Sequence, residues 1–202
     1  MLKKDRCTWL MRPISKLMHN IEPFFLWRDV YRSEDDPNAL NYKNQYSEFH
    51  YTNKVYNFVL HPQWDNFGSD TLLYKLIYAD YDEQFCIIEL IGEWNDAINN
   101  DIMIFKTELI NQLIDCGIQN FVVIMENVLN FHADGDDYYH EWKEEINGEI
   151  YLINALPHVL DELHRYHLKN QLSFGGRLND IDWRKLKPDQ IIELLETKFL
   201  EG

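Results

Sequence analysis

Apolar and polar residues follow a regular order from Thr71 to the end of the chain. Residues 71–79 and 85–92 are rich in aliphatic and aromatic side chains, and the short polar stretch between them has the length of a hairpin connection. The pattern therefore predicts two strands that follow each other directly along the chain.

Residues 95–115 are predicted to form a helix, because their apolar residues recur at helical spacing. The positions that share one face are Ile98, Ile102, Phe105, Leu109 and Leu113. Asp96 or Asn99 can cap the start of this helix, and Gly117 stands where a helix would end. Residues 121–125, FVVIM, come next, and such a continuous apolar run is typical of a strand covered on both faces.

The second half of the chain repeats the alternation. Helices are predicted at residues 136–146, 156–166 and 188–200, and short strands at residues 149–154 and 171–174. From Thr71 the order is then β-β-α-β-α-β-α-β-α. This order predicts a layered α/β domain over residues 71–202, with a mixed sheet whose central strands are parallel.

Residues 19–70 are dense in aromatic residues but lack a simple period. Two stretches, 48–52 and 54–60, alternate like strands. We interpret residues 19–70 as an aromatic-rich extension that packs on the core, because aromatic side chains bury large areas.

Two alternatives stay open for this extension. It could enclose a small-ligand or enzymatic pocket against the sheet, lined by Trp64, Phe67, Glu89 and Glu93. It could instead bury its aromatic residues, within residues 21–67, against another copy of the chain in a homo-oligomer.

Charge narrows the range of partners. The 202 residues carry a formal net charge of −15, although residues 1–18 form a basic N-terminal tail of net charge +4, so the remainder carries −19. This acidity argues against nucleic acid, whose binding depends largely on Lys and Arg, and against an anionic membrane surface. No apolar run is long enough for a signal peptide or a membrane span, so we expect a cytoplasmic protein.

Four segments resemble the STAS domains, the family of anti-sigma-factor antagonists and related cytoplasmic modules. They are CIIELIGEWND (residues 86–96), KTELINQLIDCGIQNFVVIMENVLNF (106–131), NFHADGDDYYHEW (130–142) and GEIYLINALPHVLDELHRYHLKNQLSF (148–174). The resemblance covers about residues 71–176. It implies a STAS-like fold and a regulatory role through protein–protein contacts.

In the phosphorylated members of that family, a serine in the loop after the central strand receives phosphate, which expels the partner. The resemblance places this loop at residues 130–137, and no Ser or Thr occurs between Glu108 and Leu172. A serine switch is therefore excluded at this position. The residues expected to dock a partner are His132, Asp134, Asp136 and Asp137. Asp134 and Asp136 can cap the following helix, supply a permanent negative charge, or do both.

Other candidate chemistry is weaker. The carboxylates Glu89, Glu93 and Asp96 cluster near a strand end that the loop at Asp134 could approach, but acidic residues are abundant in this chain. His132, Asp134, Asp136 and His140 do not have the spacing of a compact metal motif, and Cys7, Cys86 and Cys116 form no CxxC pair. GxSxG, GxxxxGK[ST] and GxGxxG motifs are absent. We expect a non-catalytic module with a protein partner and without a cofactor or metal.

Overall fold

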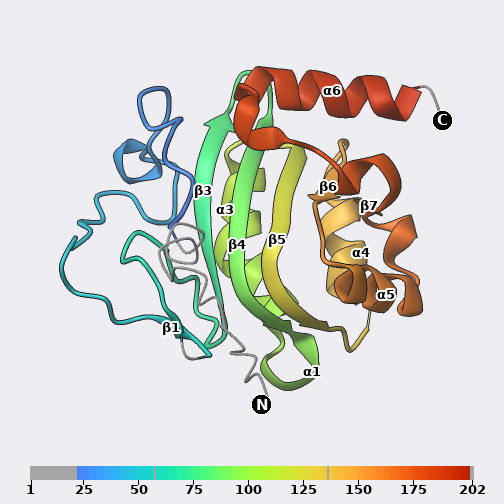
Figure 1. The fold of residues 1–202 in the computed structure, drawn as a ribbon. Helices are drawn as coiled ribbons and strands as arrows, with labels where there is room; N and C mark the ends of the chain where they lie inside the picture. The colour runs from blue at the N-terminus through green and yellow to red at the C-terminus, as the bar shows by residue number, and fades with distance from the viewer. Residues whose placement is uncertain (1–21, 57, 136, 201–202) are drawn as a thin grey trace, which may run out of the picture.

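A computed structural model describes residues 22–56, 58–135 and 137–200, the last three by their backbone alone. Its centre is a five-stranded sheet in which the strands lie side by side in chain order (Figure 1). The strands are β3 (Leu72–Asp80), β4 (Phe85–Asn95), β5 (Asn120–His132), β6 (Ile150–Ile153) and β7 (Ser173–Phe174). β3 is antiparallel to β4, whereas β4 to β7 run parallel to one another. The predicted α/β class with a mixed sheet is confirmed.

The basic tail at residues 1–18, which includes Cys7, lies outside the described residues.

Helices connect the parallel strands: α4 (Asp137–Glu144) lies between β5 and β6, and α5 (Pro157–Arg165) lies between β6 and β7. A further helix, α6 (Pro188–Leu200), follows β7. Short 3-10 turns complete this part of the chain: η5 (Leu168–Asn170), η6 (Gly176–Asn179) and η7 (Trp183–Lys185). Within the described ranges, every helix falls short of the length and hydrophobicity that crossing a bilayer requires.

The predicted helix at residues 95–115 is not continuous. It consists of α1 (Asp96–Asn99), α2 (Asp101–Ile104), the π-helical stretch η4 (Phe105–Ile110) and α3 (Asn111–Asp115). Asn100 has a left-handed backbone, with φ of 53°, and ends the first turn. Ile98 is consequently 81% exposed, whereas the other four residues of the predicted apolar face are buried. The prediction for Ile98 was therefore wrong.

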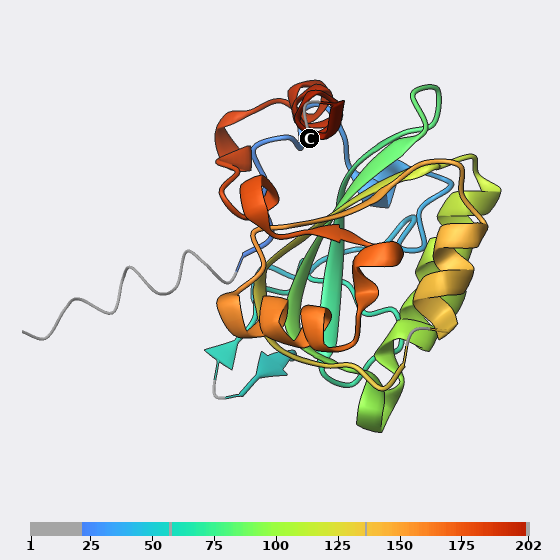
Figure 2. The ribbon, with the colours of Figure 1, turned by 90° about the vertical axis from the view of Figure 1, so that its right-hand side faces the viewer.

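The sheet is covered on both faces (Figure 2). On one face, here called the helix face, Val123 and Met125 of β5 pack against η4, α3, α4 and α5. On the other face, here called the extension face, Val122 and Ile124 pack against Trp27, Trp183 and α6. Both sides of the FVVIM run are thus buried, as predicted from its continuous apolar character.

The aromatic-rich extension contains little regular structure. It holds η3 (Ser33–Asp35), β1 (Lys54–Val55) and β2 (Phe58–Val59), and β1 pairs with β2 in a separate hairpin. The predicted strand at residues 48–52 is absent and the one at 54–60 is split, so both predictions were wrong. The split occurs because Tyr56 adopts a left-handed backbone, with φ of 51°, and reverses the chain.

Gly92 allows β4 to lie very close to the chain at the start of β3. Its φ is 127°, and a β-carbon at this position would lie 2.1 Å from the Thr71 carbonyl oxygen. The same oxygen accepts a hydrogen bond from the Glu93 backbone N–H at 2.9 Å. A side chain at residue 92 would therefore both strain the backbone and displace β3.

Gly92→Ala should lower the free energy of unfolding by roughly 2–4 kcal/mol, because the β-carbon meets backbone that cannot yield easily. Gly135→Ala is the matched control, since a β-carbon there meets nothing within 4 Å; its effect should stay below about 1 kcal/mol. Denaturant titration of both variants measures the difference. Equal losses would contradict the close approach at Gly92.

Candidate functional site

A cleft of about 330 Å³ lies beyond the carboxyl ends of β4 and β5. One wall is the α1–α2 turn, with Asp96 and Ile98, and the other is the loop after β5 with the start of α4, which contribute Asp134 and Asp137. In sheets with parallel strands, ligands commonly bind outside the carboxyl ends of the strands. The structure thus brings two predicted docking residues together with Asp96, whose approach to this loop the strand order had suggested.

The Asp96 carboxylate is buried and holds three elements together. Its Oδ1 accepts hydrogen bonds from Trp94 Nε1 and from the Ile102 backbone N–H, both at 2.8 Å. Its Oδ2 accepts one from the Tyr139 hydroxyl of α4 at 2.7 Å. Burial raises the pKa of Asp96 to about 6, although these three donors favour the charged form. Because both of its oxygens accept hydrogen bonds from within the protein, Asp96 stabilises the wall of the cleft.

A second buried carboxylate, Asp101, fixes the same turn. Its Oδ2 accepts the Asn95 backbone N–H and its Oδ1 accepts the Ser69 hydroxyl, both at 2.7 Å. Burial raises the pKa of Asp101 as well. The two carboxylates cross-link the end of β4, the start of α2 and the chain before β3, so this wall is held rigidly.

The open side of the cleft is acidic and partly apolar. Asp134 and Asp137 are exposed, and the described residues that line the cleft include no Lys, Arg or His. Ile98 stands exposed beside them. His132 is exposed but lies against the Asn130 side chain, with Nε2 2.8 Å from Asn130 Nδ2, and Asp136 lies outside the described residues. The arrangement offers negative charge next to an apolar contact.

Phe67 lies on the other face of the sheet from Trp64, so the four residues expected to line a pocket under the extension do not all come together, which corrects that grouping. Trp64 packs with Leu73 on the extension face, whereas Phe67 packs against Phe105 on the helix face. Between Trp64 and Phe67, Asp65 pairs with Tyr74 across the edge of β3, so the chain passes from one face of the sheet to the other. Of the two glutamates, Glu93 accepts a hydrogen bond from Tyr56, and Glu89 lies in the middle of β4.

An ionic cluster that the sequence analysis missed joins the extension to the sheet. Lys75 Nζ lies 2.9 Å from Asp65 Oδ2 and 2.8 Å from the Tyr46 hydroxyl, and Asn41 Nδ2 donates to the same Asp65 oxygen at 2.9 Å. Burial lowers the pKa of Lys75 and raises that of Asp65. Lys75 interrupts the apolar stretch LLYKLIYA, and a lysine in such a stretch indicates that an acidic partner is buried beside it. This pattern could have revealed the cluster from the sequence.

Glu89 is the most deeply buried acidic group of the extension face, at 0% exposed. Its Oε2 accepts the Phe24 backbone N–H at 2.8 Å, and its Oε1 lies 3.5 Å from Asn127 Nδ2 and 3.6 Å from an Arg184 nitrogen. Burial raises its pKa to about 7, more than these partners lower it. Glu89 therefore links the extension to β5 and to η7.

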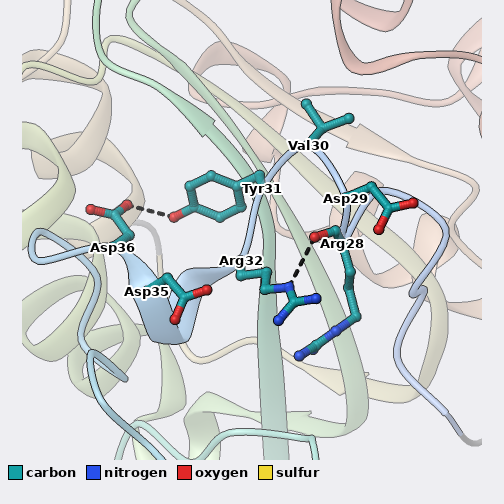
Figure 3. A pocket seen from close by; sticks show the side chains of 7 residues that line it. All are labelled: Arg28, Asp29, Val30, Tyr31, Arg32, Asp35 and Asp36. Carbon is teal, nitrogen blue, oxygen red and sulfur yellow. Dashed lines mark hydrogen bonds between the residues drawn. The ribbon is translucent and has the colours of Figure 1, made fainter.

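A larger hollow, of about 500 Å³, lies over the loop at residues 28–36 (Figure 3). Four of its lining residues bind each other: the Tyr31 hydroxyl donates to Asp36 at 2.6 Å, and Arg32 Nε donates to the Arg28 carbonyl at 3.0 Å. The hollow reflects how this loop folds on itself, and the acidic cleft is the better candidate site.

The described cysteines are free thiols, and burial raises the pKa of both Cys86 and Cys116, which disfavours a reactive thiolate. Within residues 22–56, 58–135 and 137–200, no group of three or more His, Cys, Asp or Glu is placed to hold a metal ion.

No model of a known protein family matches the chain, and no curated protein matches it. The likeness to STAS domains thus remains a prediction that depends on the four segments given above.

Replacing Glu89 by Gln should stabilise the protein increasingly as the pH rises. Against its ordinary pKa of 4.5, the native value of about 7 means that the unfolded chain releases this proton first, so wild-type stability is lost between these pH values. The gain for Glu89→Gln should grow from under about 1 kcal/mol at about pH 5 to about 3 kcal/mol at about pH 8. Denaturant titration across this range measures it.

The exposed Glu83→Gln serves as the control, because it makes the same substitution at a surface position. A difference between Glu89→Gln and wild type that does not grow with pH, or that grows equally for Glu83→Gln, would show that Glu89 does not titrate in this way.

Proposed function

We propose that the chain is a non-catalytic cytoplasmic regulatory or protein-interaction module with a STAS-like fold, which binds a protein partner at the acidic cleft. The observation that carries this proposal is the cleft between Asp96 and the loop at Asp134 and Asp137. The likeness of residues 71–176 to STAS domains supports it, because that family places its docking surface at the corresponding loop. The element order of the mixed sheet is compatible with the same assignment.

The partner that fits this cleft presents Lys or Arg next to an apolar side chain. Among the described residues, none forms an ion pair with Asp134 or Asp137, so both carboxylates are available to a cationic group. The long aliphatic stems of Lys and Arg can lie along Ile98 while their charged ends reach the carboxylates. The overall charge of −15 would also attract a basic partner over longer distances.

The docking loop would carry its charge permanently. Residues 130–137 contain no Ser or Thr, so their negative charge does not depend on phosphorylation at a hydroxyl. In this proposal, binding is regulated by the amount of partner or by the ionic strength, and a phosphate switch within this loop plays no part.

Asp134→Asn/Asp137→Asn should weaken the captured partner's binding by roughly tenfold or more, mainly through loss of charge complementarity. The measurement is affinity capture from native lysate, followed by titration with the purified partner. Glu144→Gln/Asp161→Asn is the matched control, because it removes the same charge from exposed positions that do not line the cleft. Equal effects of the two double variants would mean that only the overall acidity matters.

A third variant, Ile98→Ser, separates docking in the cleft from long-range attraction. It should weaken binding by several-fold without changing the dependence on salt concentration, because it removes apolar contact and no charge. Binding that is unaffected by both Ile98→Ser and Asp134→Asn/Asp137→Asn would overturn the proposed site.

A further inference from the structure

The acidic cleft fits a ligand of particular chemistry. The described residues that line it include no Lys, Arg or His, and its walls carry Asp134 and Asp137 beside Ile98, which is 81% exposed. A ligand for these walls combines positive charge with apolar side chains. A segment of the same chain with this composition would therefore be a ligand at very short range.

Residues 1–18, which lie outside the described residues, have this composition. Their charged residues are Lys3, Lys4, Arg6, Arg12 and Lys16 against Asp5. The segment thus holds five of the 19 Lys and Arg residues of the chain and a net charge of +4, whereas residues 19–202 carry −19. The apolar run WLM, residues 9–11, falls between Arg6 and Arg12. Cationic and apolar side chains are therefore close together along this segment.

The segment is long enough to reach the cleft from the point where the described chain is anchored. The Phe24 backbone N–H donates to Glu89 Oε2 at 2.8 Å, in the middle of β4. From Glu89 to Asn95, at the end of β4, the strand runs about 20 Å. The stretch from Arg12 to Phe24 can span about 40 Å when extended. Arg12 and the residues before it can therefore reach the cleft beyond the end of β4.

Attachment to the same chain makes even a weak contact effective. A tethered segment reaches an effective concentration on the order of 1 mM at a site within its span. With an intrinsic dissociation constant of about 0.1 mM, it would occupy the cleft in about nine molecules of ten. A separate basic partner would then bind about tenfold more weakly than it binds a free cleft.

We propose that residues 3–16 bind in cis across the acidic cleft and compete there with the protein partner. The cationic side chains then lie near Asp134 and Asp137, and the apolar run between them lies near Ile98. The competition rests on the function proposed above, whereas the contact between segment and cleft does not depend on it. The chain thereby withholds its docking site until a partner of higher affinity or concentration displaces the segment.

Paramagnetic relaxation in the full chain tests the contact. A nitroxide is attached to Cys7 in a Cys116→Ser background, in which Cys86 is the remaining thiol and is buried. The amide signals of Ile98 and Tyr138, which line the cleft, should lose most of their intensity. Asp134→Asn/Asp137→Asn should restore these signals, because it removes the charge that attracts the segment.

Charge reversal separates this contact from general attraction. Arg6→Glu/Arg12→Glu should restore the signals, since it replaces attraction by repulsion. Lys185→Glu/Lys187→Glu is the matched control and should leave the broadening in place. It makes the same change in net charge at exposed positions in η7 and just before α6, at the end of the sheet opposite α1 (Figure 1). Signals that stay sharp in the starting chain, or that both reversals restore equally, overturn the proposal.

A mixture distinguishes binding in cis from binding between copies. It combines isotopically labelled Cys7→Ser/Cys116→Ser chain with unlabelled chain that carries the nitroxide. The labelled signals should stay sharp in this mixture. Broadening as strong as in the singly labelled experiment would place the segment on another copy and overturn binding in cis.

Titration with the captured partner tests the competition. Arg6→Glu/Arg12→Glu should bind this partner about tenfold more tightly than wild type, and Lys185→Glu/Lys187→Glu should bind it as wild type does. Broadening without this gain in affinity overturns the competition. A partner that depends on Asp134 and Asp137, in a chain that shows no broadening, overturns the present inference and leaves the proposed function intact.

Discussion

The apolar run of β5 requires cover on both faces of the sheet, and the rest of the architecture depends on this requirement. Val123 and Met125 are buried by the helices, whereas Val122 and Ile124 are buried by Trp27, Trp183 and α6. The helices between the strands cover only the helix face, because successive right-handed crossovers in one direction place them on the same side. The extension and α6 therefore form the third layer and are part of the core.

Much of the α/β order could be predicted because it depends on local periodicity. The strands and helices from Thr71 onward appear in the expected sequence, and Gly117 and Pro188 mark ends that follow from backbone chemistry. Where the prediction failed, one residue overrode the pattern. Asn100 breaks the helical period and moves Ile98 to the surface, and Tyr56 turns a single predicted strand into a hairpin.

The residues of the candidate site were likewise only partly predictable from the sequence. The resemblance to STAS domains points to Asp134 and Asp137, and the strand order predicts that their loop approaches Asp96. The separation of Trp64 from Phe67 could not be anticipated, because it depends on Asp65 pairing with the edge of β3. Long-range pairings of this kind leave no periodic signal in the sequence. One hydrogen bond of Asp96 likewise comes from Tyr139, which is 43 positions away.

The third layer also has a consequence for the order of folding. Trp27 Nε1 donates to the Leu186 carbonyl at 3.2 Å, across 159 positions of the chain, and Trp27 packs against Trp183. During synthesis, the extension leaves the ribosome long before Trp183 and Leu186, so Trp27 meets these partners only after residue 186 has emerged. Until then the extension face of the sheet remains uncovered, with Ile87 and Val122 among the apolar residues that await it. Completion of this layer is therefore a non-local event, and the growing chain depends on residues 183–195 to bury the surface that its earlier strands have already formed.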